Sequence, residues 1–314
     1  MKLKELSYYL NYPLIRPNKL DILITDKCNQ NCVMCNRKKF DKELSLEEFK
    51  NYVNQTANWG IKHINISGGE PLLRKDDSIE LIEQAKKRGI FTTLVTNGSL
   101  LNKKTCEELF NSGLDVITIS LDGLEKTHDR IRGKGSFKKI IIALQNIQKL
   151  RRGNRFVSNI VTVVMKYNYK ELVDVYELAV KYGVENIMYQ CILDETKEQK
   201  YWLDEEDIKL LKQITNELIT IKRLKGKIGN QEEFFKSLPD YFNRNLKNER
   251  CYAGYDEMIV NPDGSLSTCT GIILKNTLIR NIKKLWRAKE YNLIRKEMKK
   301  CKKPCMVLCW SDKK

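Results

Sequence analysis

Short apolar runs alternate with longer stretches of helical periodicity through the first 190 or so residues. The runs are rich in β-branched and aromatic residues, as strands are. They span Leu20–Thr25, His63–Ser67, Phe91–Thr96, Val116–Ser120, Phe156–Val164 and Asn186–Gln190. Between them, helical patterns cover about 45–59, 77–88, 102–111, 136–152 and 169–182, and glycines follow several of their ends.

This alternation predicts parallel strands joined by right-handed helical crossovers. Six such units are too few to close an eight-stranded barrel. We therefore expect an α/β fold built as a partial, open (β/α)6 TIM-like barrel over residues 20–192, preceded by an arm, 1–19, that is irregular or a short helix.

The remaining chain predicts a helical connector and a small C-terminal domain. In 193–250, apolar residues recur at helical spacing from Ile208 to Ile221, and a second short helix carries Phe234, Phe235, Tyr241 and Phe242 as core residues. In 251–314, strands Tyr255–Val260 and Ser265–Cys269 flank a turn and form a β-hairpin. A helix over about 281–299 follows, with an apolar face of Ile282, Leu285, Trp286, Leu293 and Ile294.

Composition favours a cytoplasmic protein that binds metal. No apolar run is long enough to span a membrane, and residues 1–5 lack the pattern of a signal peptide. Ten cysteines in such a chain indicate a reducing compartment and metal sites in place of disulfides.

Basic residues are concentrated at the C-terminus. The formal net charge is +17, and residues 275–314 hold 14 Lys and Arg against 3 Asp and Glu. This excess is either a solvated surface or a site for an acidic partner: an acidic peptide, a phosphorylated small molecule or RNA. No RNA-binding motif or interleaved aromatic pattern accompanies the charge, so nucleic acid is the least favoured of the three.

Three cysteines follow the first predicted strand. Cys28, Cys32 and Cys35 have Cys-x3-Cys-x2-Cys spacing, which lets one tight loop turn three thiolates toward one centre. Three thiolates can hold three irons of a [4Fe–4S] cluster and leave the fourth open to a small molecule. The alternatives are unrelated buried cysteines or a zinc loop, but zinc loops more often use Cys-x2-Cys pairs and need a fourth ligand. The nearest histidine, His63, lies inside an apolar run.

Polar chemistry also follows the next strands, whose carboxyl ends meet at one edge of such a sheet. After the second strand, Gly68 and Gly69 allow close approach of a ligand, and Glu70, before Pro71, offers a carboxylate to an ammonium group; an ordinary turn is the alternative. Further candidates are Thr96 and Asn97 after the third strand, and Ser120, Asp122 and Arg132 after the fourth. His128, Asp129 and Arg132 would otherwise form a polar network that braces a loop.

The cysteine loop and the Gly68-Gly69-Glu70-Pro71 segment together resemble the radical S-adenosylmethionine (radical SAM) enzymes. The resemblance covers about 18–192. It implies a [4Fe–4S] cluster on the three cysteines and SAM on the open iron, with its amino group held by the Gly-Gly-Glu-Pro motif. Met34 replaces the usual aromatic residue before the third cysteine and would pack near the adenine. The stretch from Ser120 to Phe137 resembles the subgroup that modifies peptides and carries C-terminal clusters.

Five more cysteines near the C-terminus suggest a second metal site: Cys251, Cys269, Cys301, Cys305 and Cys309. The hairpin, with Gly264 before Cys269, and the later Leu285-Trp286 resemble the SPASM/twitch domains of radical SAM enzymes. Five cysteines support one auxiliary [4Fe–4S] cluster, where full SPASM domains have seven cysteines and two clusters. Zinc is the alternative metal.

The resemblance implies reductive cleavage of SAM to a 5′-deoxyadenosyl radical, with electrons from a donor such as flavodoxin or ferredoxin. We expect a peptide substrate, acidic to suit the basic tail, that undergoes oxidation, crosslinking or epimerisation. The alternatives are a small-molecule dehydrogenase or epimerase acting on an amino sugar or cyclitol, and a non-catalytic metal-bound scaffold. Cys191 ends the sixth strand as either a small buried hydrophobe or a hydrogen donor to a substrate radical, and Cys106 has a structural role.

Overall fold

The computed structural model describes residues 3–150, 157–193, 199–246, 251–269, 272–274, 281–301 and 305–306. Its strands are β1 (Lys19–Thr25), β2 (His63–Gly68), β3 (Phe91–Thr96), β4 (Val116–Ser120), β5 (Val157–Val164), β6 (Asn186–Cys191), β7 (Glu257–Val260), β8 (Leu266–Cys269) and β9 (Ile272–Leu274). Its α-helices are α1 (Leu3–Leu10), α2 (Leu46–Trp59), α3 (Lys75–Lys87), α4 (Lys103–Asn111), α5 (Glu125–Arg132), α6 (Ser136–Leu150), α7 (Leu172–Lys181), α8 (Glu205–Lys225), α9 (Glu232–Phe242), α10 (Ile282–Trp286) and α11 (Lys289–Lys300). Short 3₁₀ helices are η1 (Pro71–Arg74), η2 (Tyr169–Glu171) and η3 (Gln199–Tyr201).

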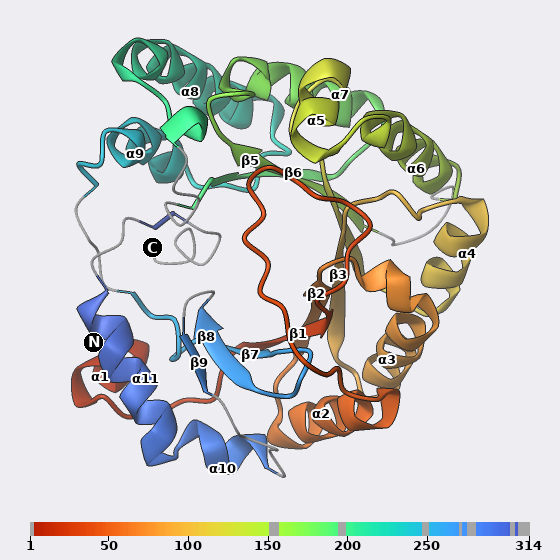
Figure 1. Cartoon of the computed structure of the whole chain (residues 1–314), viewed down its shortest axis with the longest axis vertical. Helices are drawn as coiled ribbons and strands as arrows, with labels where there is room; N and C mark the ends of the chain where they lie inside the picture. The colour runs from red at the N-terminus through yellow and green to blue at the C-terminus, as the bar shows by residue number, and fades with distance from the viewer. Residues whose placement is uncertain are drawn as a thin grey trace.

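The described strands form one curved sheet in the order β6-β5-β4-β3-β2-β1-β7-β8-β9. Strands β6 to β1 pair in parallel in sequence order, and the helices between them cover the outside of the sheet (Figure 1). The sheet does not close, so the predicted open (β/α)6 barrel is confirmed.

The C-terminal hairpin extends this same sheet. β7 pairs in parallel with β1, from Lys19 opposite Glu257 to Ile22 opposite Val260, and β8 returns antiparallel to β7. The predicted hairpin is thus confirmed, while β9, antiparallel to β8, is an addition that the sequence pattern did not show. The sheet therefore carries residues of the C-terminal region to the side of the cysteine loop.

Side-chain caps and a C-terminal glycine determine where α2 and α8 begin and where α2 ends. Ser45 and Glu48 form a reciprocal capping box at the start of α2, and Gly60 ends that helix at φ +81°. Asp204 and Asp207 form a second capping box at the start of α8. These caps satisfy backbone groups that no intrahelical bond can reach, so they fix where each helix begins.

Two helical regions differ from the prediction. The segment after β4, expected as a loop, contains α5, whose His128, Ile131 and Arg132 are buried. The single helix expected over 281–299 is two helices, because Ala288 adopts an extended conformation that starts α11 anew. The break shifts the phase of the buried face, so Leu293, predicted to be buried, is 61% exposed. Ile282, Trp286 and Ile294 are buried as predicted.

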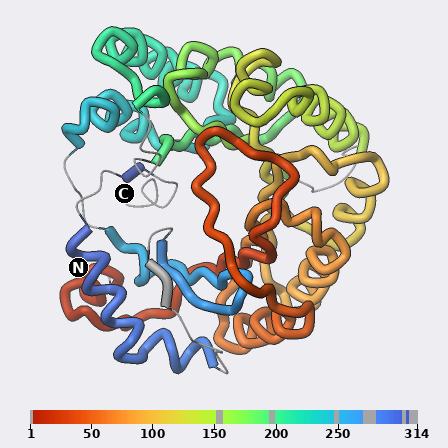
Figure 2. Tube along the Cα trace, viewed as in Figure 1, coloured from red at the N-terminus to blue at the C-terminus, as the bar shows by residue number. Residues whose placement is uncertain are grey.

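The N-terminal helix lies against the C-terminal region on one side of the molecule. α1, the short helix allowed for the N-terminal arm, lies beside α11 (Figure 2). The Tyr8 ring lies 5.8 Å from that of Tyr255, and the Trp286 indole N–H donates to the Ile15 carbonyl at 2.9 Å. These contacts fix the N-terminal arm against the C-terminal region.

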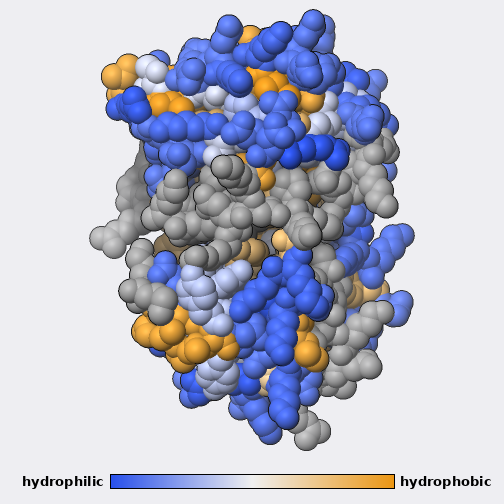
Figure 3. All heavy atoms as spheres, turned by 90° about the vertical axis from the view of Figure 1, so that its left-hand side faces the viewer, coloured by the Kyte–Doolittle hydropathy of each residue, from blue (hydrophilic) through white to orange (hydrophobic). Residues whose placement is uncertain are grey.

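The surface on this side is mainly hydrophilic, with separate apolar patches (Figure 3). Exposed apolar side chains of the two terminal helices include Leu3 and Leu10 on α1 and Leu293 on α11. No helix in the described ranges is both long enough and apolar enough to cross a membrane.

Candidate functional site

The cysteine loop, residues 26–45, crosses the mouth of the barrel between β1 and α2 (Figure 1). Cys28 and Cys32 are half-buried, Cys35 is exposed, and all three are free thiols. Glu43 anchors the loop, because its carboxylate accepts from the Thr25 hydroxyl at 2.5 Å and from the Asp26 backbone at 3.2 Å. Met34, beside Cys35, packs partly buried against the core.

Gly68 and Gly69 lie against the backbone of this loop. The Gly69 N–H donates to the Thr25 carbonyl at 2.7 Å, and the Glu70 N–H donates to the Lys27 carbonyl at 2.8 Å. A Cβ atom on Gly69 would lie 2.0 Å from the Lys27 carbonyl oxygen, and one on Gly68 would lie 2.4 Å from that of Thr25. The two glycines therefore let the second strand end pack directly on the cysteine loop.

Glu70 is fully buried, and its carboxylate accepts three hydrogen bonds that join the end of β2 to the end of β3. It accepts from the Leu72 N–H at 3.0 Å, the Thr96 hydroxyl at 2.7 Å and the Asn97 N–H at 2.8 Å. Burial raises the pKa of Glu70, although these hydrogen bonds oppose the shift. A bound cation would favour the charged carboxylate, and the ammonium role of this residue stays a prediction. Pro71, also buried, begins η1 directly after it.

Asn97 connects the end of β3 to the first cysteine. Its amide donates to the Asn29 side chain at 2.8 Å and lies 3.7 Å from the Cys28 sulfur. Asn97 thus contacts the cysteine loop, while Thr96 bonds to Glu70, and the role of both in binding a ligand stays a prediction.

Asp122 and Arg132 form a buried ion pair beside the second cysteine. The Arg132 Nε donates to Asp122 at 2.5 Å, and its Nη1 lies 3.8 Å from the Cys32 sulfur. Burial raises the pKa of Cys32, and the Arg132 guanidinium opposes that shift. Arg132 thus faces a cysteine sulfur, a contact that the sequence could not show. Ser120, the last residue of β4, is buried nearby.

His128 braces this part of the site. Its Nδ1 accepts from the Asp122 backbone N–H at 3.1 Å, while its Nε2 has no hydrogen-bond partner among the described residues. Burial lowers the pKa of His128 to about 4, so the ring is neutral at pH 7. Asp129 accepts from the Gly135 and Phe137 N–H groups at 2.6 and 2.8 Å. The polar network predicted for this segment is present on and after α5.

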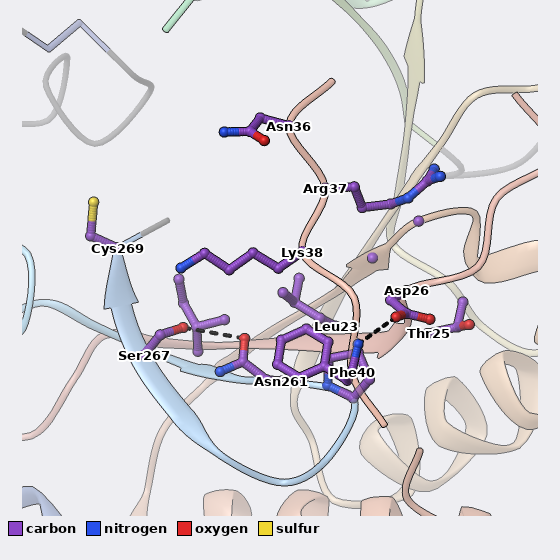
Figure 4. Close-up of a pocket in the computed structure, with 14 residues that line it drawn as sticks. Leu23, Thr25, Asp26, Asn36, Arg37, Lys38, Phe40, Asn261, Ser267 and Cys269 are labelled. Carbon is purple, nitrogen blue, oxygen red and sulfur yellow. Dashed lines mark hydrogen bonds between the residues drawn. The ribbon is translucent and has the colours of Figure 1, made fainter. Parts of the chain in front are cut away.

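A cavity of about 220 Å³ separates the cysteine loop from the C-terminal hairpin. Asn36, Lys38 and Phe40 line it from the loop, Gly68 and Gly69 from the end of β2, and Asn261, Ser267 and Cys269 from the hairpin (Figure 4). These loop residues were not among the predicted site residues, although the basic run Arg37-Lys38-Lys39 was a usable signal.

Three of the C-terminal cysteines lie close to α11. Cys251 and Cys269 both pack against a small apolar cluster of Ala253, Ile294 and Met298. Cys301 follows α11 directly, and its N–H donates to the Met298 carbonyl at 3.2 Å. Cys305 is half-buried, and Cys309 lies outside the described residues.

The two other cysteines are buried. Cys191, at the end of β6, is 3% exposed, and burial raises the pKa of its thiol, with a further contribution from Cys305. The pKa of Cys106 is raised by burial to about 12, and its sulfur lies 3.7 Å from the Leu101 carbonyl oxygen, as suits a structural residue.

The donor set of the cysteine loop fits a [4Fe–4S] cluster. Three free thiols come from one loop, and an amide and a guanidinium lie within 4 Å of two of the sulfurs. Within the described ranges, no three His, Cys, Asp or Glu side chains converge as ligands of a single metal ion do. A [4Fe–4S] cluster takes one thiolate per iron, so its ligands surround the cluster without converging on one ion.

Comparison with known proteins gives a family match and several relatives. The Radical SAM superfamily model matches residues 22–199. Fe-coproporphyrin III synthase of Methanosarcina barkeri is 35% identical over 162 residues, which cover 49% of this chain and 39% of that protein. PqqA peptide cyclase of Rhodopseudomonas palustris is 27% identical over 289 residues, which cover 85% of this chain and 72% of that protein. The chain thus spans less than half the length of the first relative.

Among solved structures, Streptococcus suis SuiB bound to its precursor peptide SuiA matches with a TM-score of 0.72. The match covers 93% of this chain and 70% of that chain at 19% sequence identity. At this level of identity the likeness establishes a shared fold.

Proposed function

The chain belongs to the radical SAM superfamily, and from this premise we propose that it modifies a peptide with the help of one auxiliary [4Fe–4S] cluster. When bound, the family's [4Fe–4S] cluster and SAM supply a 5′-deoxyadenosyl radical that abstracts hydrogen from a substrate carbon. The observation that carries the proposal is the cavity whose wall extends from the cysteine loop to Cys269. A substrate held there would lie between the two cysteine sites.

The residues of the barrel mouth have distinct parts in this proposal. Cys28, Cys32 and Cys35 would hold the first cluster, and Glu70 would receive the ammonium group of SAM. Asn97 and Arg132 direct N–H groups at the sulfurs of Cys28 and Cys32. Met34, Ser120 and Asp122 remain proposed SAM-site residues.

The second cluster is proposed for residues 251–314. Cys251 and Cys269 pack against the apolar cluster beside α11, and the Cys301 N–H donates to Met298 of that cluster, which supports a shared site. Cys305 and Cys309 are the candidates for further ligands. Bound next to the cavity, this cluster would accept the electron left on an oxidised substrate or bind the substrate itself.

A peptide substrate is supported by one relative, named as a peptide cyclase, that is similar over most of the chain. The 289-residue match to PqqA peptide cyclase is longer than the family segment and therefore includes residues outside it. The fold shared with SuiB, which was solved with a precursor peptide, covers nearly the whole chain. Cys191 remains a proposed hydrogen donor, which an epimerase would need.

Metal content tests the two-cluster proposal. Iron and acid-labile sulfide are measured on anaerobically reconstituted wild type and on the Cys28→Ala/Cys32→Ala/Cys35→Ala variant. About eight irons in the wild type and about four in the variant are expected. About four irons falling to none would refute the auxiliary cluster and would favour redox-neutral chemistry.

Deuterium transfer tests the substrate class. Cells grown in deuterated medium supply a peptide fraction and a small-molecule fraction, and each is incubated with reconstituted enzyme, SAM and dithionite. A gain of one mass unit in 5′-deoxyadenosine with the peptide fraction alone is expected. A gain with the small-molecule fraction alone would refute the peptide proposal.

A further inference from the structure

We propose that Lys38 selects an acidic side chain of the substrate, so that the cavity beside the cysteine loop receives a glutamate or aspartate of the peptide. This inference rests on the proposed peptide-modifying function and adds a recognition residue to it. Lys38 lies three residues after Cys35, and it lines the cavity that the proposed function assigns to substrate.

The direction of the Lys38 side chain carries the argument. Its amine extends from the cysteine loop across the cavity toward Ser267 and Cys269 on the hairpin, whereas the neighbouring Arg37 guanidinium points the opposite way (Figure 4). Lys38 is therefore the cation directed at the proposed substrate position.

The charge of Lys38 is not balanced by the described part of the chain, where it forms no ion pair within 4.0 Å. The acidic residue in the described lining is Asp26, whose Oδ2 instead accepts from the Phe40 backbone N–H at 2.7 Å. A substrate carboxylate would thus meet a cation that has no competing acid.

The rest of the lining suits a side chain with an aliphatic stem. Leu23, Phe40 and Ile259 give the cavity apolar walls, against which methylene groups would pack while the carboxylate reaches the amine. Ser267 and Asn261 already hydrogen-bond to each other at 3.4 Å, so the hairpin offers a polar but uncharged wall.

Size favours one side chain over a whole nucleotide or sugar phosphate. The volume of about 220 Å³ is below the roughly 300–1,000 Å³ of pockets that enclose drug-sized ligands. Recognition of a phosphate group also tends to use several cations or a cradle of backbone N–H groups. Arg37 also belongs to the lining, but its guanidinium points the opposite way (Figure 4), so the single lysine amine matches a single carboxylate better.

Peptide selection tests the inference without requiring the natural substrate. Reconstituted wild type with SAM is immobilised and exposed to a random heptapeptide pool, and retained peptides are sequenced by mass spectrometry. Glutamate should be enriched about fivefold over glutamine, the ratio expected for one partly exposed ion pair. The enrichment should vanish in Lys38→Met and persist in Lys38→Arg. Lys39→Met, which removes an adjacent exposed lysine outside the cavity lining, should behave as the wild type.

Each remaining outcome contradicts the inference in a different way. Retained peptides without acidic preference, or equal preference in Lys38→Met, would overturn the role of Lys38 and leave the peptide function standing. Retention of no peptide by the wild type would overturn both. A loss of SAM affinity in Lys38→Met, measured by calorimetry, would assign the amine to the cofactor carboxylate and also overturn the inference. Iron content and circular dichroism of each variant verify that it is folded and loaded.

Discussion

The contact between Gly69 and the cysteine loop makes Gly69→Ala a sharp test of how the loop is held. A Cβ at this position would lie 2.0 Å from the Lys27 carbonyl oxygen, 2.6 Å from its carbon and 2.8 Å from the Asp26 oxygen. All three atoms are backbone, so no side-chain rotation can relieve the overlap. The φ angle of Gly69 lies outside the left-handed region, so alanine would cause no backbone strain there. Any effect of Gly69→Ala would therefore come from steric overlap alone.

The required movement is larger than a metal site tolerates. Ordinary contact begins at 3.4 Å, so the backbone at Lys27 must retreat by about 1.4 Å. Overpacking of this kind costs about 1–3 kcal/mol of unfolding free energy. Ligand positions in metal sites are held to within about 0.2 Å, and Cys28 is the next residue along the chain. We therefore expect Gly69→Ala to lose most iron from the first cluster while the fold persists.

The assay is iron and sulfide content after anaerobic reconstitution, with thermal unfolding measured in parallel. Gly89→Ala is the matched control, because a Cβ there meets nothing within 4 Å although φ is +66°. Its unfolding free energy should fall by about 1 kcal/mol because alanine is strained in the left-handed region, and its iron content should equal that of the wild type. Wild-type iron content in Gly69→Ala would refute the idea that this close backbone contact positions the cysteines.

Three further predictions concern stability. Asp122→Asn should lower the unfolding free energy by about 3–5 kcal/mol, because it leaves the buried Arg132 charge unpaired; urea denaturation measures this, and a loss below 1 kcal/mol would contradict it. Burial depresses the pKa of His128 from 6.5 to about 4, so its contribution to stability is complete above pH 6.5 and falls by about 3 kcal/mol as the pH drops toward 4. His128→Asn should therefore flatten the dependence of unfolding free energy on pH in that window, and an unchanged slope would refute the assignment. Ser45→Ala should cost about 0.5–2 kcal/mol by removing the capping box with Glu48, without changing iron content; a Tm equal to that of the wild type would show that the cap is not needed.

The barrel was predictable because each strand is a short apolar run bounded by turn residues. β3 and β4 match their predicted limits, and β2 extends one residue beyond its prediction. The pattern failed where burial is polar: α5 buries His128 and Arg132, so no apolar periodicity marks that helix. The break at Ala288 also has no glycine or proline to announce it.

The cysteine loop and the strand-end residues were found because a few residue types at fixed spacing carry the chemistry. What remained hidden depends on distances across the chain. Arg132 meets Cys32 over a separation of 100 residues, and Lys38 faces Cys269 across the cavity. Such contacts come from the curvature of the sheet, which no local pattern specifies.

The pairing of β1 with β7 has a consequence for how the chain is made. β1 leaves the ribosome long before its neighbour on one side, which belongs to residues 257–260. Until those residues emerge, one edge of an apolar strand has unpaired N–H and C=O groups, and such edges recruit other strands. A polypeptide that stops before β7 would keep that edge open for good, so truncated products are the species expected to aggregate or to engage chaperones.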